Sequence, residues 1–174
     1  MKPEAPQPVK LFLGILYSIP DLLPKAAHLI TEKFGHIDYK SPEFEFTVSE
    51  YYKTEMGWPI FRRFFSMENL IDPGELPAIK ISTNGIEDKL APGGQRKINL
   101  DPGYLDYNKV VLASAKYNSQ KIYLGLGIYA DPTLWYEKGE FKPYSSAFPD
   151  FKSDLYNKTF LHIRSLYKIR KSEK

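Results

Sequence analysis

The sequence has 174 residues, of which 43% are hydrophobic and 26% are charged, a composition typical of a globular protein with room for one core. It contains no cysteine, which excludes disulfides, thiolate catalysis and cysteine-ligated zinc. The net charge of +3 is too small an excess to indicate a nucleic-acid binder by itself, and the positive residues gather mainly from Lys168 onward.

The N-terminal segment shows no signal-peptide pattern. Residues 1–8 contain three prolines, and we expect them to form a loose arm before a single domain of residues 9–174. The apolar run that follows is too short to cross a bilayer. We therefore expect a cytoplasmic protein without a membrane partner.

The first predicted elements are a strand and a helix. Val9–Tyr17 is apolar on both alternating faces, which predicts a central strand covered on two sides. Gly14 leaves a gap in this strand, which is either a packing gap or a place where another backbone or a ligand can come close. A helix is predicted next, from an N-cap at Asp21 to a C-terminal glycine at Gly35.

Two further strands are predicted at residues 43–48, where apolar and polar side chains alternate, and at residues 58–67. Arg62 and Arg63 are neighbours in the second of these strands, so their side chains point to opposite faces. One of the two should face an interior, where it would need an acidic or phosphate partner.

A second helix is predicted after residues 72–75, Asp-Pro-Gly-Glu, which have the spacing of a capping box. Pro77 argues for a later start with Glu75 as the effective cap, because proline lacks the N–H that a helix needs. Lys80, Asn84 and Glu87 then share one helical stripe. This stripe is either a solvated face or a face that points toward a functional site.

The richest run of functional groups is residues 96–104, Arg-Lys-Ile-Asn-Leu-Asp-Pro-Gly-Tyr, which starts as an alternating strand and ends in a turn. Lys97, Asn99 and Asp101 should share one face of this strand. Burying one unpaired polar group costs about 1–3 kcal/mol, so these side chains need partners from the protein, water or a ligand. Candidate partners are Glu43 or Glu45, Arg62 or Arg63, and Lys116.

The C-terminal third is harder to interpret. Residues 107–116 fit a short helix capped by Asp106 or a strand equally well. A strand is predicted at residues 121–130, a β-hairpin at residues 133–142, and a final helix from about Asp150.

The order of elements up to Asp101 is strand, helix, strand, strand, helix, strand, which is that of a split βαβ, ferredoxin-like unit. We therefore expect an α+β fold in which two helices cover one face of an antiparallel sheet. Because the first strand is apolar on both faces, the C-terminal β-hairpin and helix should pack on the second face of the same core.

Several short motifs occur in a fixed order: Tyr51-Tyr52 with Glu55-Met56-Gly57, Lys80 with Thr83-Asn84 and Glu87, Arg96 with the run from Asn99 to Tyr104, Gly127-Ile128-Tyr129-Ala130, and Phe148-Pro149-Asp150. Together they resemble an uncharacterised bacterial family, domain of unknown function number forty-four sixteen, over nearly the whole chain. The sequence departs from that pattern at Lys121, Asp131 and Phe148. The family has no established catalytic residues, so the resemblance implies none here.

Known catalytic signatures are absent, including the nucleophile elbow, the zinc-protease motif, the P-loop and the dinucleotide fingerprint. We hypothesise a protein that binds a small anionic ligand in a polar cleft built from Lys80, Glu87, Arg96, Asn99, Asp101 and Tyr104. In this hypothesis Arg96 holds the anion, Asn99 orients it, and Asp101 pairs with a base or a cation.

Two alternatives remain open. A split βαβ sheet with many tyrosines and a basic C-terminus also fits an RNA-interaction or protein-interaction module. A metal-assisted hydrolase would need oxygen ligands for Mg²⁺ from Glu87, Asp101 and Asp131, which lie on three distant segments.

Overall fold

The computed structural model describes residues 1–48, 50–118 and 120–172. Within them the strands are β1 (Val9–Tyr17), β2 (Ile37–Lys40), β3 (Phe44–Glu45), β4 (Phe61–Ile71), β5 (Ile98–Leu105), β6 (Lys109–Ser114), β7 (Ile122–Gly125), β8 (Ile128–Glu137) and β9 (Glu140–Pro143). The α-helices are α1 (Leu22–Phe34), α2 (Glu50–Met56), α3 (Leu76–Lys89) and α4 (Asn157–Ser172).

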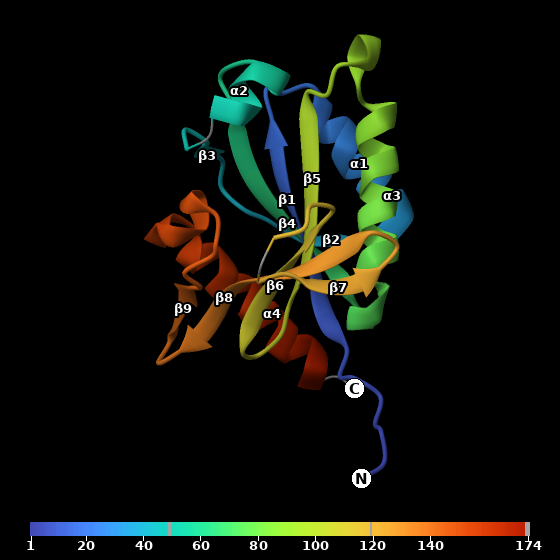
Figure 1. The fold of residues 1–174 in the computed structure, drawn as a ribbon, viewed down its shortest axis with the longest axis vertical. Coiled ribbons are helices and arrows are strands. Elements are labelled where there is room, and N and C mark those ends of the chain that lie inside the picture. Colours follow the sequence, from blue (N-terminus) through green and yellow to red (C-terminus); the bar gives the residue numbers. More distant parts are fainter. Residues whose placement is uncertain (49, 119, 173–174) are drawn as a thin grey trace.

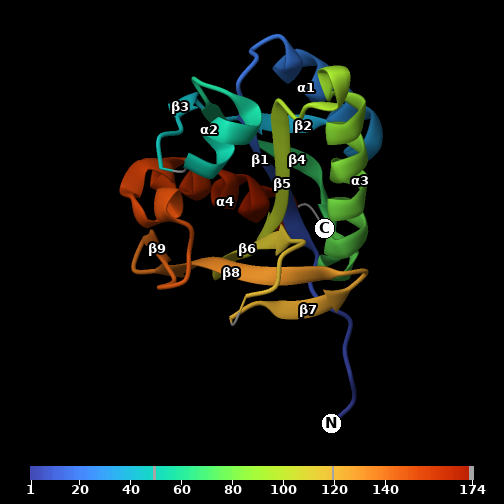
Figure 2. The same cartoon turned by 45° about the horizontal axis from the view of Figure 1, so that its top comes forward.

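These elements form an α+β fold around one antiparallel sheet of nine strands in the described residues. The strand order is β2-β4-β1-β5-β6-β8-β7, with β3 beside β4 and β9 beside β8. Helices α1 and α3 lie on one side of the sheet and α4 lies on the other (Figures 1 and 2). No helix among the described residues is long and apolar enough to cross a membrane.

Strand β1 is the centre of the fold, as predicted. All nine of its residues are buried, and it pairs with β4 along one edge and β5 along the other. Leu13 and its same-face neighbours pack beneath α1 and α3, whereas Phe12 packs against Phe160 and Ile163 of α4. The prediction that the final helix covers the second face is therefore confirmed, whereas the predicted β-hairpin extends the same sheet through β8 and β9.

The sheet is larger than a four-stranded unit. Strands β2, β4, β1 and β5 lie side by side, with α1 between β1 and β2 in the chain and α3 between β4 and β5. Residues 109–114 form strand β6, so the strand interpretation of residues 107–116 is correct and the helix interpretation is wrong. Val110 and Leu112 pack in the core beside α4, and Val111 packs in a separate apolar cluster on the other face. Because alternate residues are buried on both faces, the segment is stable as a strand.

Both predicted N-terminal helices form. Helix α1 ends at Gly35, whose φ of 92° is the left-handed conformation that glycine favours, although the Asp21 side chain makes no cap hydrogen bond. The capping box closes around a short 3-10 turn, Pro73–Glu75, and α3 begins immediately after it. The hairpin between β8 and β9 is also confirmed, with positive φ at Lys138 and Gly139.

Other boundaries differ from the predictions. Only Phe44–Glu45 of residues 43–48 is strand, the predicted strand at residues 58–67 runs from Phe61 to Ile71, and Glu50–Met56 is a helix that we did not predict. This helix is fixed by a tertiary contact, because Met56 packs on Leu16 in a small apolar cluster, which no local pattern reveals.

Two C-terminal predictions also need correction. Residues 121–130 form two strands, because Leu126 and Gly127 make a turn with positive φ values of 54° and 74°. The last helix begins at Asn157, after two 3-10 turns that cover Pro149–Lys152 and Asp154–Tyr156.

Candidate functional site

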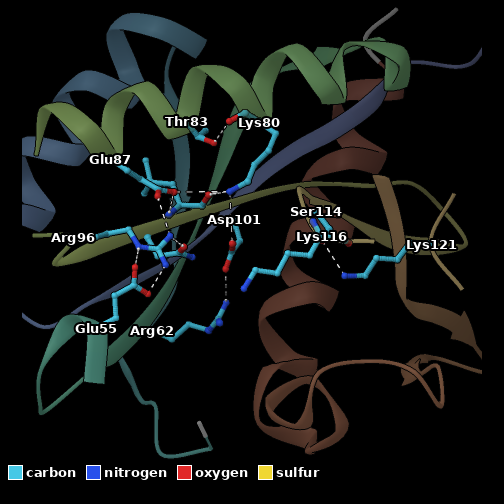
Figure 3. A network of polar contacts seen from close by, with 12 residues as sticks. Glu55, Arg62, Lys80, Thr83, Glu87, Arg96, Asp101, Ser114, Lys116 and Lys121 are labelled. Carbon is cyan, nitrogen blue, oxygen red and sulfur yellow. Dashed lines mark hydrogen bonds and ion pairs between the residues drawn. The ribbon is translucent and has the colours of Figure 1, made fainter. Parts of the chain in front are cut away.

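A network of charged side chains lies at the point where β5 and β6 separate (Figure 3). Strand β5 pairs with β1 along its whole length but with β6 only from Gly103 to Leu105. The backbone of β5 before Gly103 therefore has an edge without a strand partner in the described chain. We call the network the Asp101 cluster; its members are Glu55, Arg62, Lys80, Glu87, Arg96, Asn99, Asp101 and Lys116.

Lys80 and Glu87 complete the open edge of β5. The Leu100 N–H donates to Glu87 Oε1 at 2.7 Å, and Lys80 Nζ donates to the Leu100 carbonyl at 2.8 Å. These two side chains of α3 thus satisfy the backbone groups that a neighbouring strand would otherwise bind. The stripe that contains them is buried against β5, which excludes the solvated alternative for Lys80 and Glu87.

Burial also shifts the pKa of Glu87. Desolvation raises the pKa of Glu87 above its ordinary value, and the nearby Lys80 ammonium, the Leu100 N–H and Arg96 oppose that shift, whereas Asp101 adds to it. Lys80 Nζ lies 3.9 Å from Glu87 Oε1, so this pair attracts without a direct hydrogen bond.

Arg96 connects three elements. Its Nε and Nη2 donate to the two oxygens of Glu55 at 2.9 and 2.7 Å. Its Nη1 donates to Asn99 Oδ1 at 2.7 Å and to Glu87 Oε2 at 3.3 Å. Burial opposes its charge, but the Glu55 and Glu87 carboxylates hold the pKa of Arg96 above its usual range. Most of its N–H groups are therefore already engaged.

Asp101 lies between cations. Its Oδ1 is 3.9 Å from Lys80 Nζ and its Oδ2 is 3.9 Å from Arg62 Nη1, and the side chain is 24% exposed. Lys116 points toward the same space between Asp101 and Arg62 (Figure 3). Because 3.9 Å is longer than a hydrogen bond, the Asp101 oxygens attract these two cations without being saturated by them.

Arg62 is the buried arginine of the predicted pair. Its guanidinium lies over the rings of Phe46, Phe64 and Phe151 at 5.1, 5.7 and 5.6 Å, and its Nε is 3.2 Å from Asp150 Oδ2. Despite these neighbours, neither Nε nor Nη1 makes a well-aligned hydrogen bond, and the same is true of Asn99 Nδ2. Three buried donors among the described residues thus make no hydrogen bond at this place, although Arg62 Nε forms an ion pair with Asp150.

Comparison with known families agrees with the resemblance seen in the sequence. The model of the family "Domain of unknown function (DUF4416)" matches residues 7–167, nearly the whole chain. The chain belongs to the DUF4416 family. Neither the curated proteins nor the solved structures gave a match.

The structure of this DUF4416 chain brings together most of the predicted site residues: Lys80, Glu87, Arg96, Asn99 and Asp101. Tyr104 is the exception, because it shares a strand face with Leu100 and not with Asp101. It packs against an apolar cluster that includes Leu76 and Val111, and burial raises its pKa.

Sequence reasoning missed Glu55 and Asp150 as partners of the two arginines. Both occur in short motifs that carry the DUF4416 resemblance, which was the available signal. Of the other suggested partners, Glu43 instead accepts a hydrogen bond from the Tyr17 hydroxyl, and Glu45 is exposed.

The three departures from the family pattern contact one another. Lys121 Nζ is 3.4 Å from Asp131 Oδ2 and 5.6 Å from the centre of the Phe148 ring, and it donates to Ser114 Oγ at 2.9 Å. Asp131 is thus committed to Lys121. In the described part of the chain no three acidic or histidine side chains are grouped to hold a metal ion, so the alternative of a Mg²⁺ site built from Glu87, Asp101 and Asp131 has no support in the geometry.

Proposed function

We propose that this DUF4416 chain binds a small anionic ligand at the Asp101 cluster, with Arg62, Lys80 and Lys116 supplying the positive charge. The observation that carries this proposal is the group of buried donors that make no hydrogen bond in the described chain, Arg62 Nη1 and Asn99 Nδ2, together with Arg62 Nε, which forms only an ion pair with Asp150. Each such donor costs about 1–3 kcal/mol when it stays unsatisfied. A phosphate or carboxylate group offers the acceptors that these donors need.

The strand register supports a common location for these donors. Arg62 on β4 and Asn99 on β5 are both opposite Leu16 of β1, so their side chains share one face of the sheet. Asp101 is opposite Gly14 on the same face, two positions away. Strands in a sheet are about 4.8 Å apart, so Arg62 and Asn99 lie roughly 10 Å apart across Leu16, with Asp101 beside them at Gly14.

The roles differ from those expected from the sequence. Arg96 is bound by Glu55, Glu87 and Asn99, so we assign the anion to Arg62 and Lys80 instead. Asp101 retains free acceptor capacity between the cations, and it would accept a hydrogen bond from a hydroxyl or amine of the same ligand. The ligand class is therefore a small metabolite with both an anionic group and a hydrogen-bond donor.

We also propose that β1–α1–β2 and β4–α3–β5 form a split βαβ, ferredoxin-like unit, and that residues 9–174 are one domain. The antiparallel order β2-β4-β1-β5 supports the first statement, and the continuity of one sheet from β1 to β9 supports the second. The RNA alternative loses its main support, because an RNA-binding sheet of this type presents aromatic residues on an open face. Here α1 and α3 cover one face of the part of the sheet around β1, and α4 covers the other face of that part.

The test is a thermal-shift titration with matched compounds, in which each phosphorylated or carboxylated metabolite is paired with its neutral analogue. Orthophosphate alone is included as the minimal anion. We expect at least one anionic compound to raise Tm in a saturable manner while its neutral analogue does not, as ligand linkage requires. If no anion raises Tm, the cluster is a structural network and the proposal is wrong.

A further inference from the structure

Strand β7 is the outermost strand of the main sheet path, and in the described chain it pairs only with β8. Figure 2 shows it at the lower boundary of the molecule, away from α1, α2 and α4. Its apolar side chains are unusually exposed: Ile122 and Tyr123 by 60% each and Leu124 by 40%. Leu126 in the following turn is 68% exposed.

Aromatic rings extend this surface. Tyr117 is 73% exposed, and its ring centre is 5.7 Å from that of Tyr129. Tyr123 lies 5.3 Å from the same ring. We call the resulting surface the β7 patch; its members are Tyr117, Ile122, Tyr123, Leu124, Leu126 and Tyr129.

The β7 patch carries little charge. The segment from residue 122 to residue 130 contains neither a charged residue nor a proline, the two residue kinds that commonly block pairing at an exposed sheet edge. Lys121 does not supply a charge to the patch, because its ammonium is turned toward Asp131 and its side chain is only 6% exposed.

We propose that a second copy of this chain covers the β7 patch, with the two β7 strands paired in antiparallel orientation across a twofold axis. A twofold axis makes the two contacting surfaces identical, and an uncharged patch can meet its own copy without like-charge repulsion. Nucleic acid fits less well, because it would need cations on the patch for its phosphates. This proposal is independent of ligand binding at the Asp101 cluster.

The size of the patch agrees with this partner. A large side chain contributes on the order of 150–250 Å², so the exposed fractions correspond to roughly 450–750 Å² per copy. Two copies would bury at most about 900–1,500 Å², which spans the lower limit of specific interfaces. We therefore expect a dimer of moderate affinity that dissociates on dilution.

The experiment is sedimentation equilibrium on the full chain over a wide concentration range, with Ile122→Lys as the test variant. The control is Ile169→Lys on α4, since Ile169 is 56% exposed and receives the same substitution away from the patch. We expect a wild-type dimer, a dissociation constant at least about tenfold higher for Ile122→Lys, and no change for Ile169→Lys.

A second measurement keeps the proposal testable even if Ile122→Lys fails to fold. Hydrogen exchange of wild-type amides 122–125 should slow as protein concentration rises. A wild-type chain that stays monomeric, a dimer that both variants weaken equally, or exchange in β7 that is independent of concentration would each overturn the proposal. Binding of single-stranded RNA that Ile122→Lys alone abolishes would also overturn it and would identify RNA as the occupant.

Discussion

The guanidinium of Arg62 lies directly against Gly14, on the face of β1 that meets α4. A Cβ on Gly14 would come within 3.0 Å of Arg62 Nη1 and 3.3 Å of Phe64 Cε1. Phe46 and Phe151 confine the guanidinium from other sides, so it cannot move away freely. The missing side chain at Gly14 thus permits Arg62 to lie flat between β1 and Asp150, with Nη1 facing Asp101.

Gly14→Ala should destabilise the protein by about 1–3 kcal/mol, because the added methyl overpacks the contact with Arg62 and Phe64. Urea unfolding measures this loss. The matched control is Gly85→Ala on α3, where a Cβ would meet nothing within 4 Å. That variant should be neutral or more stable by up to about 1 kcal/mol, as a helical glycine predicts. Equal effects of the two substitutions would contradict the close approach of Arg62.

Glu87→Gln should reveal the raised pKa of Glu87. A carboxyl whose pKa is higher in the folded state than in the unfolded state makes its stabilising contribution below the unfolded pKa and loses it as the pH rises through the folded pKa. The free energy of unfolding of the wild type, minus that of Glu87→Gln, should therefore fall as the pH increases above the ordinary value of 4.5.

Urea titrations at a series of pH values measure this difference, and Glu4→Gln in the exposed N-terminal arm gives the background. If the difference instead grows with pH, attraction to Lys80 and Arg96 outweighs burial, and the direction assigned to this pKa is wrong.

The Arg96–Glu55 pair should couple α2 to β5. The contact is bidentate, and both side chains are about a third exposed, so solvent screening limits its strength. A double-mutant cycle with Arg96→Ala and Glu55→Ala should give a coupling free energy of about 1 kcal/mol, measured by urea unfolding. A coupling near zero would show that α2 is held in place by Met56 and its apolar neighbours alone.

The sequence predicted the parts of the fold that local patterns determine. Val9–Tyr17 is a buried strand because every position is apolar, and Gly35 ends α1 because its φ of 92° suits glycine. Helix α2 has no comparable pattern. It is only seven residues long, and its Met56 is buried by contacts with distant segments of the chain. Strand β6 was ambiguous since Val110 and Val111 suit a strand while Asp106 suits a helix cap, and only packing on both faces decides.

The candidate site shows the same division. Alternation predicted that Lys97, Asn99 and Asp101 share a face, and helical spacing paired Lys80 with Glu87. Neither rule states which arginine of the Arg62–Arg63 pair faces inward, because alternation fixes only that they oppose each other. Nor does any rule bring Glu55 or Asp150 to these side chains, since their approach depends on how α2 and the C-terminal third pack on the sheet.

Asp101→Asn should increase the affinity for orthophosphate by severalfold. Asp101 competes for Lys80 and Arg62, and its removal leaves both cations to the added anion. Isothermal titration of orthophosphate into the variant and the wild type measures the change. Asp88→Asn, an exposed position on α3, is the control and should leave the affinity unchanged. An unchanged affinity in Asp101→Asn would place phosphate binding outside the cluster.

The most direct measurement compares Lys116→Gln with Lys168→Gln in binding an anionic compound that stabilises the wild type. Both lysines are exposed, but Lys116 points toward Asp101 and Arg62 (Figure 3), whereas Lys168 lies on α4. A charge-assisted hydrogen bond contributes about 1.5–3 kcal/mol, so Lys116→Gln should weaken binding roughly tenfold or more, whereas Lys168→Gln should change it less than about twofold. Equal affinities of the two variants would contradict anion binding at the Asp101 cluster.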